Sequence, residues 1–217
     1  MAVKPSRSLV ICTLLFLLSL TSCSGELEDF LFGGAIYSVG DIGPSGGYIF
    51  YDKGYYSDSW RYLEAAPEGW NGADADPAIM FGYTRDPWNG QNRKAGFGRD
   101  YELFFLGKAN TRAIIRYVGE TAYSNSSGKA KAPYAASLCW MYRGGGFDDW
   151  FLPSERELDL MYKNLKKRGL GSFSSSRYWS SSEDGALFAF SQDFYGGGGH
   201  LYEDRNMEFC VRPVRSF

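Results

Sequence analysis

Side chains suited to catalysis or metal binding are sparse in this sequence. His200 is the single histidine, and no Cys/His spacing suits zinc. Ser180, Ser181 and Ser182 are consecutive, but they lack the G-x-S-x-G context of a nucleophilic serine, and a catalytic triad would depend on His200 alone. Carboxylate pairs for glycoside hydrolysis stay open, because the fold sets their separation, although nothing marks out two of them. We therefore expect no catalytic residue, no bound metal and no cofactor.

Residues 1–22 have the pattern of an export signal. Lys4 and Arg7 precede an apolar run over 9–20, which is shorter than the roughly 20 residues of a membrane-spanning helix. The run ends in LTSC, residues 20–23, which resembles the lipobox of bacterial lipoproteins; the alternative is plain secretory cleavage with an incidental Cys23. We expect a lipid such as palmitate on Cys23, an acidic tether over 23–33, and attachment to the outer membrane or cell surface.

Composition indicates one folded domain over 34–217. The aromatic content of 18% is too high for a disordered chain, and the length allows a real core. The formal net charge is -2, and removal of Lys4 and Arg7 with the signal makes the chain more acidic. No basic excess suggests binding to nucleic acid.

A short segment from loop to helix organises the expected fold. The apolar run over 150–152 is predicted to be a buried strand or a wedge between layers. Ser154 and Glu157 have the spacing of a capping box, so a helix is predicted to begin at Glu155 and to end near Gly169. Its apolar stripe repeats at helical spacing over Leu158, Met161, Tyr162 and Leu165.

The remaining elements are short. Two further helices are expected, one from Asn110 or Thr111 to Val118 and one over 134–142. The glycine-rich stretch over 40–47 precedes an aromatic segment and not a helix, which favours a turn into a sheet over a phosphate-binding loop. Strands are expected over 48–52, 60–65, 79–83, 177–182, 186–194 and 207–214.

Five segments in order resemble a known family. They are 39–47 (VGDIGPSGG), 107–111 (GKANT), 149–154 (DWFLPS), 178–183 (YWSSSE) and 211–215 (VRPVR). They are similar to the Lcl-type C-terminal domain family of bacterial surface lipoproteins and collagen-like adhesins, and span about residues 37–217. The resemblance implies an α+β fold: a single C-type-lectin-like domain with a twisted antiparallel sheet and two to three short helices. Adhesin members bind sulfated glycans, and the resemblance also suggests a trimer, although the sequence itself defines no oligomeric state.

The resemblance also bears on cysteines and calcium. With Cys23 acylated, Cys139 and Cys210 remain, and in an exported protein they are expected to form a disulfide; related domains join a helix to the last strand in this way. Oxygen ligands are present in Asp148, Asp149, Glu183 and Asp184, but the Glu-Pro-Asn and Trp-Asn-Asp tripeptides of calcium-dependent lectins are absent. We expect Asp148 and Asp149 to bond to the turn backbone.

We therefore expect a lipid-anchored binding module that recognises glycans or host or envelope proteins. Candidate contacts are aromatic residues in glycine-rich loops, namely Trp88, Tyr195, His200 and Tyr202, with the adjacent pair Tyr55 and Tyr56. A basic cluster for a sulfated glycan is formed by Lys163, Lys166, Lys167 and Arg168. The alternatives are a structural envelope lipoprotein without a ligand site, and a divergent hydrolase or oxidase related to formylglycine-generating enzymes.

Overall fold

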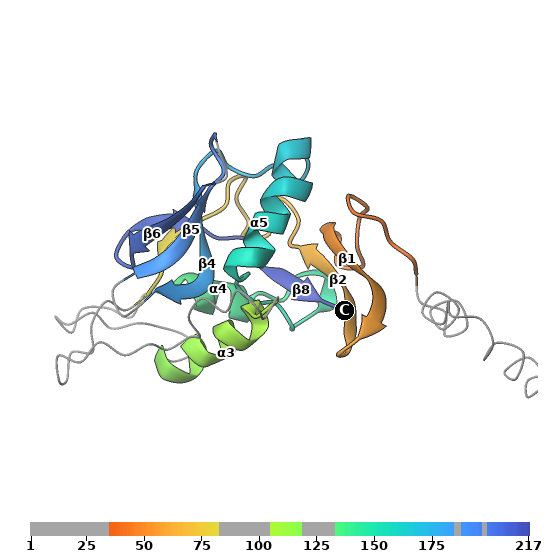
Figure 1. Cartoon of the computed structure of the whole chain (residues 1–217), viewed down its shortest axis with the longest axis horizontal. Coiled ribbons are helices and arrows are strands. Elements are labelled where there is room, and N and C mark those ends of the chain that lie inside the picture. The colour runs from red at the N-terminus through yellow and green to blue at the C-terminus, as the bar shows by residue number, and fades with distance from the viewer. Residues whose placement is uncertain (1–34, 83–104, 119–132, 185–187, 197–198) are drawn as a thin grey trace, which may run out of the picture. The chain divides into compact units, whose positions relative to one another are not determined.

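The computed structural model describes residues 35–82, 105–118, 133–184, 188–196 and 199–217 (Figure 1). The chain divides into two compact units. The smaller unit includes residues 53–61, where Lys53 lies over the ring of Trp60 and pairs with Asp58 at 3.6 Å. The larger unit consists of residues 37–52 and 62–217.

The strands form two sheets. The first has the order β1-β2-β8, and consists of β1 (Tyr48–Ser57), β2 (Trp60–Ala65) and β8 (Val214–Ser216). The second has the order β3-β7-β4-β5-β6, and consists of β3 (Ala78–Met80), β7 (Glu208–Cys210), β4 (Arg177–Asp184), β5 (Phe188–Asp193) and β6 (His200–Asp204). Strands β4 and β7 run parallel, so the expectation of one antiparallel sheet is wrong.

In the described part of the chain, three α-helices and two short 3₁₀ turns accompany the sheets, which confirms the α+β class. The helices are α3 (Gly107–Val118), α4 (Ala135–Met141) and α5 (Glu155–Asn164), and the turns are η1 (Gly144–Gly146) and η2 (Lys166–Arg168). Helix α5 packs against β4 and β5, and α3 packs against β4 and α4 (Figure 1).

The start of α5 has the predicted capping box. Ser154 Oγ accepts a hydrogen bond from the Glu157 amide at 3.4 Å, and Glu157 Oε2 accepts one from the Ser154 amide at 2.6 Å. The preceding Trp150, Phe151 and Leu152 are almost wholly buried, and Phe151 pairs with Val214 through two backbone hydrogen bonds of 2.8 and 2.9 Å. The segment is therefore a buried link between α5 and the end of the chain.

Two strand predictions need correction. The stretch over 207–214 is split, because residues 211–213 leave the second sheet at Cys210 and enter the first at Val214. Pro213 lacks an N–H for a ladder, and Arg212 is held by contacts outside the sheet. Strand β6 begins at His200, inside the stretch over 195–202 that the sequence predicted to be a loop. It pairs with β5 in antiparallel register, which the glycine-rich sequence before His200 did not indicate.

Candidate functional site

Many polar residues in the five motif segments hold the fold together. Asp76 Oδ1 accepts hydrogen bonds from Arg212 Nε at 2.6 Å and Trp70 Nε1 at 2.8 Å. Asp76 Oδ2 accepts from Tyr178 Oη at 2.5 Å and Arg212 NH2 at 2.8 Å. Arg212 NH1 donates to the carbonyls of Ala66 and Gly171, so four of the five N–H groups of this buried guanidinium are bonded within the chain.

A second buried cluster surrounds Arg215. Its guanidinium forms a bidentate ion pair with Asp149, in which Nε donates to Oδ1 at 2.9 Å and NH2 donates to Oδ2 at 3.2 Å. NH1 of Arg215 lies 3.4 Å from Glu64 Oε2. Glu64 Oε1 accepts hydrogen bonds from the amides of Ser45 and Gly47. A Cβ on Gly47 would lie 1.8 Å from the Ala65 carbonyl, so this glycine lets the turn approach β2. The turn over 40–47 is thus structural, as predicted.

These contacts also account for two candidate calcium ligands. Asp149 bonds to the Arg215 side chain, which corrects the expectation that it bonds to the turn backbone. Glu183 is fully buried and lies 3.2 Å from Arg205 NH1. Among the described residues, no group of three or more His, Cys, Asp or Glu side chains is arranged to hold a metal ion.

The expected disulfide is absent from the structure. Cys139 in α4 and Cys210 in β7 are both buried free thiols. Burial raises the pKa of each thiol, and the nearby Asp76 charge raises both further. A thiol with a raised pKa is a poor nucleophile at neutral pH, which argues against an oxidase that uses these cysteines.

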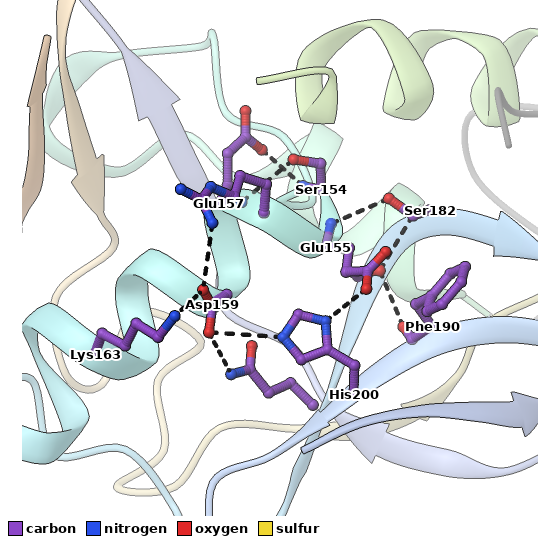
Figure 2. Close-up of polar contacts among 11 residues, drawn as sticks. Ser154, Glu155, Glu157, Asp159, Lys163, Ser182, Phe190 and His200 are labelled. Carbon is purple, nitrogen blue, oxygen red and sulfur yellow. Dashed lines mark hydrogen bonds and ion pairs between the residues drawn. The ribbon is translucent and has the colours of Figure 1, made fainter. Parts of the chain in front are cut away.

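A polar cluster joins α5 to β6 in the larger unit (Figure 2). His200 Nδ1 lies 2.6 Å from Glu155 Oε1, and His200 Nε2 lies 3.6 Å from Asp159 Oδ1. Gln192 Nε2 donates to Asp159 Oδ1 at 3.3 Å, and Lys163 Nζ donates to Asp159 Oδ2 at 2.7 Å. The imidazole therefore lies between two carboxylates, as Figure 2 shows.

Local structure explains why these groups meet. Glu155 and Asp159 are four residues apart, so they lie on the same face of α5. Gln192 and His200 are direct cross-strand partners on β5 and β6, so their side chains share one face of the sheet. Ser182 Oγ accepts a hydrogen bond from the Glu155 amide at 3.0 Å, which ties the first turn of α5 to β4.

The charges in the cluster support one another. The hydrogen bond to Glu155 raises the pKa of His200; burial opposes this, and the charges of Glu155 and Asp159 add to it. Burial acts to raise the pKa of Asp159, but the hydrogen bond and charge of Lys163, with the charge of His200, bring it below its ordinary value. The charged form of His200 is thus favoured at mildly acidic pH.

Exposed aromatic side chains occur on β5, on β6 and in the turn after β5. Tyr202 is 44% exposed, lies two residues after His200 on the same face of β6, and its ring is 4.6 Å from that of Phe190. Tyr195, in the turn after β5, is 80% exposed, and Phe188 at the start of β5 is also exposed. We call Glu155, Asp159, Gln192, His200 and Tyr202 the α5–β6 surface.

The structure thus brings together part of the predicted site. His200, Tyr202 and Lys163 meet at the α5–β6 surface, whereas Trp88 and Cys23 lie outside the described residues. The sequence analysis missed Glu155, Asp159 and Gln192. The i, i+4 spacing of Glu155, Asp159 and Lys163 was a usable signal, but nothing local pointed to Gln192.

The predicted basic cluster is largely engaged in contacts within the chain. Lys163 pairs with Asp159, and Lys166 Nζ donates to the Phe173 carbonyl at 2.7 Å and to Ser175 Oγ at 3.2 Å. Arg168 NH1 donates to the Val39 carbonyl at 3.1 Å. Lys167 is exposed. The four cations therefore do not form one open anion site.

Within the described part of the chain, none of the helices has the length and hydropathy needed to cross a bilayer.

No family model matches the chain, and no curated protein matches it. Among solved structures, it is similar to a fimbrial protein from Bacteroides ovatus, with 14% sequence identity and a TM-score of 0.38. The match covers 72% of this chain and only 36% of the fimbrial protein. Values this low support no inference about function.

Proposed function

We propose that this chain is an exported surface binding module that recognises a glycan or a protein through the α5–β6 surface. One observation carries the proposal: exposed Tyr202 lies two residues from His200 on the same face of β6, and His200 contacts Glu155 and Asp159 on α5. An aromatic ring supplies a flat apolar contact, and the neighbouring polar groups supply directional bonds.

The positions of these groups suit recognition. Glu155 is 23% exposed, so a ligand has access to its carboxylate, whereas His200 and the 7% exposed Asp159 hold the geometry of the cluster. Both ends of the cluster lie on regular elements, α5 and β6, which hold side chains more firmly than loops. Tyr195, in the turn after β5, is a further exposed ring.

We further propose that the chain acts by binding and not by catalysis. Each nitrogen of His200 faces a carboxylate, so neither nitrogen is presented to a substrate as a general base. Ser182 belongs to the run of serines over 180–182. Its Oγ accepts a hydrogen bond from the Glu155 amide and does not serve as a nucleophile paired with the imidazole. The hydrolase alternative therefore lacks its base–nucleophile contact here.

The lipid anchor is part of the same proposal. The LTSC sequence at 20–23 supports acylation of Cys23, which would hold the chain at the outer membrane or cell surface. The five family-like segments support the same kind of protein. With the basic cluster engaged internally, we favour a ligand recognised by hydroxyl or amide groups over one recognised by sulfate alone.

A binding screen tests this proposal. The full-length protein, purified in detergent, is applied to a glycan array and to immobilised envelope and host surface proteins. We expect saturable binding that is reduced at least tenfold by Tyr202→Ala, the typical effect of removing an aromatic contact residue. Ile42→Ala, which truncates an exposed apolar side chain outside the α5–β6 surface, is the control and should leave binding unchanged. Binding lost equally in both variants, or no binding to any probe, would argue for the structural lipoprotein.

A further inference from the structure

His200 joins an edge strand to a helix through ionisable groups. In the strand order of the second sheet β6 comes last, next to β5, and His200 is its first residue. The imidazole is about 30% exposed and reaches Glu155 and Asp159 on α5. His200 therefore links β6 to α5 through two carboxylates.

The two groups that face the ring nitrogens of His200 are carboxylates, whose charge is opposite to that of a protonated imidazole. From α5, Glu155 and Asp159 face the two ring nitrogens, and Lys163 and Arg156 approach the other oxygen of Asp159 at 2.7 and 3.9 Å. From β5, Gln192 contributes an uncharged amide to Asp159. From β4, the Ser182 hydroxyl binds the Glu155 backbone.

The opposite face of β6 contributes no charge to this set. Glu203 points away from His200 by strand alternation and pairs with Arg177 on β4. A doubly protonated imidazole has an N–H for each of the two carboxylates, whereas a neutral ring has only one. Loss of the proton leaves a lone pair facing a carboxylate oxygen, which is repulsive.

We propose that His200 is a proton-dependent latch that holds β6 against α5 when its ring is charged and loosens β6 as the pH rises. The inference rests on the proposed function, because the same side chains form the α5–β6 surface; ligand binding is then tighter at mildly acidic than at alkaline pH. The pKa of His200 is raised in the folded protein, so the charged ring stabilises the fold. This stabilisation is complete below about pH 6.5, the ordinary pKa of histidine, and is lost as the pH rises through the pKa of His200 in the folded protein.

Amide hydrogen exchange of β6 tests the latch. The Asp193 amide donates to the Gly199 carbonyl, and the register pairs Ser191 with Leu201. The Leu201 and Glu203 amides therefore face β5 by alternation. We expect their protection factors in the full-length protein to fall about tenfold between about pH 5.5 and about pH 8.5, the usual effect of losing one hydrogen bond to a charged group. Amides of β2 in the other sheet serve as the internal reference.

His200→Gln is the matched variant, because its amide donates a hydrogen bond and does not titrate. Its β6 protection should be low at both pH values. A tenfold fall that persists in His200→Gln, or wild-type protection that does not change relative to β2, would overturn the latch.

The two proposals can fail separately. A fall in β6 protection with no binding to any array or protein probe at either pH supports the latch and overturns the proposed function. Unchanged protection with equal ligand binding at both pH values overturns the latch and leaves the proposed function standing.

Discussion

Replacement of Asp76 by alanine tests whether the buried ion pair with Arg212 stabilises the fold. Asp76 accepts four hydrogen bonds, two from Arg212 and one each from Tyr178 and Trp70. Removal of one partner of a buried pair typically costs about 3–5 kcal/mol, because the other charge remains buried without compensation. A domain is typically stable by about 5–15 kcal/mol, so we expect Asp76→Ala to lose a large part of the free energy of unfolding.

Urea denaturation followed by tryptophan fluorescence measures the free energy of unfolding of Asp76→Ala and of matched variants. Arg156→Ala removes an exposed ion pair of 3.9 Å and should cost less than about 1 kcal/mol. Arg212→Met combined with Asp76→Ala should be more stable than Asp76→Ala alone, because no unpaired charge remains. A loss below about 1 kcal/mol in Asp76→Ala, or a double variant that loses the sum of both single changes, would refute this reasoning.

Four further predictions concern separate regions. Trp150→Ala should lower the free energy of unfolding by roughly 3–5 kcal/mol in the same urea assay, since the side chain is fully buried; a variant as stable as the parent would make it a surface contact. Burial raises the pKa of Glu157 to about 7, so stability should fall between about pH 4.5 and 7 as the pH rises, and Glu157→Gln should flatten that slope in pH-dependent melting. Cys139 and Cys210 should resist alkylation in the native protein and both react in denaturant without reductant; failure to react there would reveal a disulfide. Cys23→Ala should move the protein from the membrane fraction to the soluble fraction, and retention of an unacylated variant in membranes would contradict the anchor.

Local signals in the sequence predicted the elements that depend on neighbouring residues. The α5 cap was predictable because Ser154 and Glu157 are three residues apart, and β2 was predicted with its observed bounds. The pairing of Asp76 with Arg212 spans 136 residues, so no local pattern reports it. The division of the last strand follows from that pairing, which explains why the sequence predicted one strand where the chain changes sheets.

The candidate site was predictable only in part for the same reason. His200 and Tyr202 attracted attention as rare or aromatic residues near glycines, but their strand was predicted as a loop. Glu155 and Asp159 resembled ordinary helix-surface acids until the fold placed β6 beside them. Conversely, the basic residues at the end of α5 looked open in the sequence, and the fold gives three of them partners within the chain.

The most direct test of the α5–β6 surface uses the fact that the chain has a single histidine. The proton NMR signal of the His200 ring is therefore assigned without ambiguity, and it can be followed while the strongest array or protein probe is added to the full-length protein. We predict that this signal shifts with the same saturation curve as binding, and that Tyr202→Ala abolishes both the binding and the shift. Saturable binding that leaves the His200 signal unchanged would place the ligand elsewhere and contradict the proposed function.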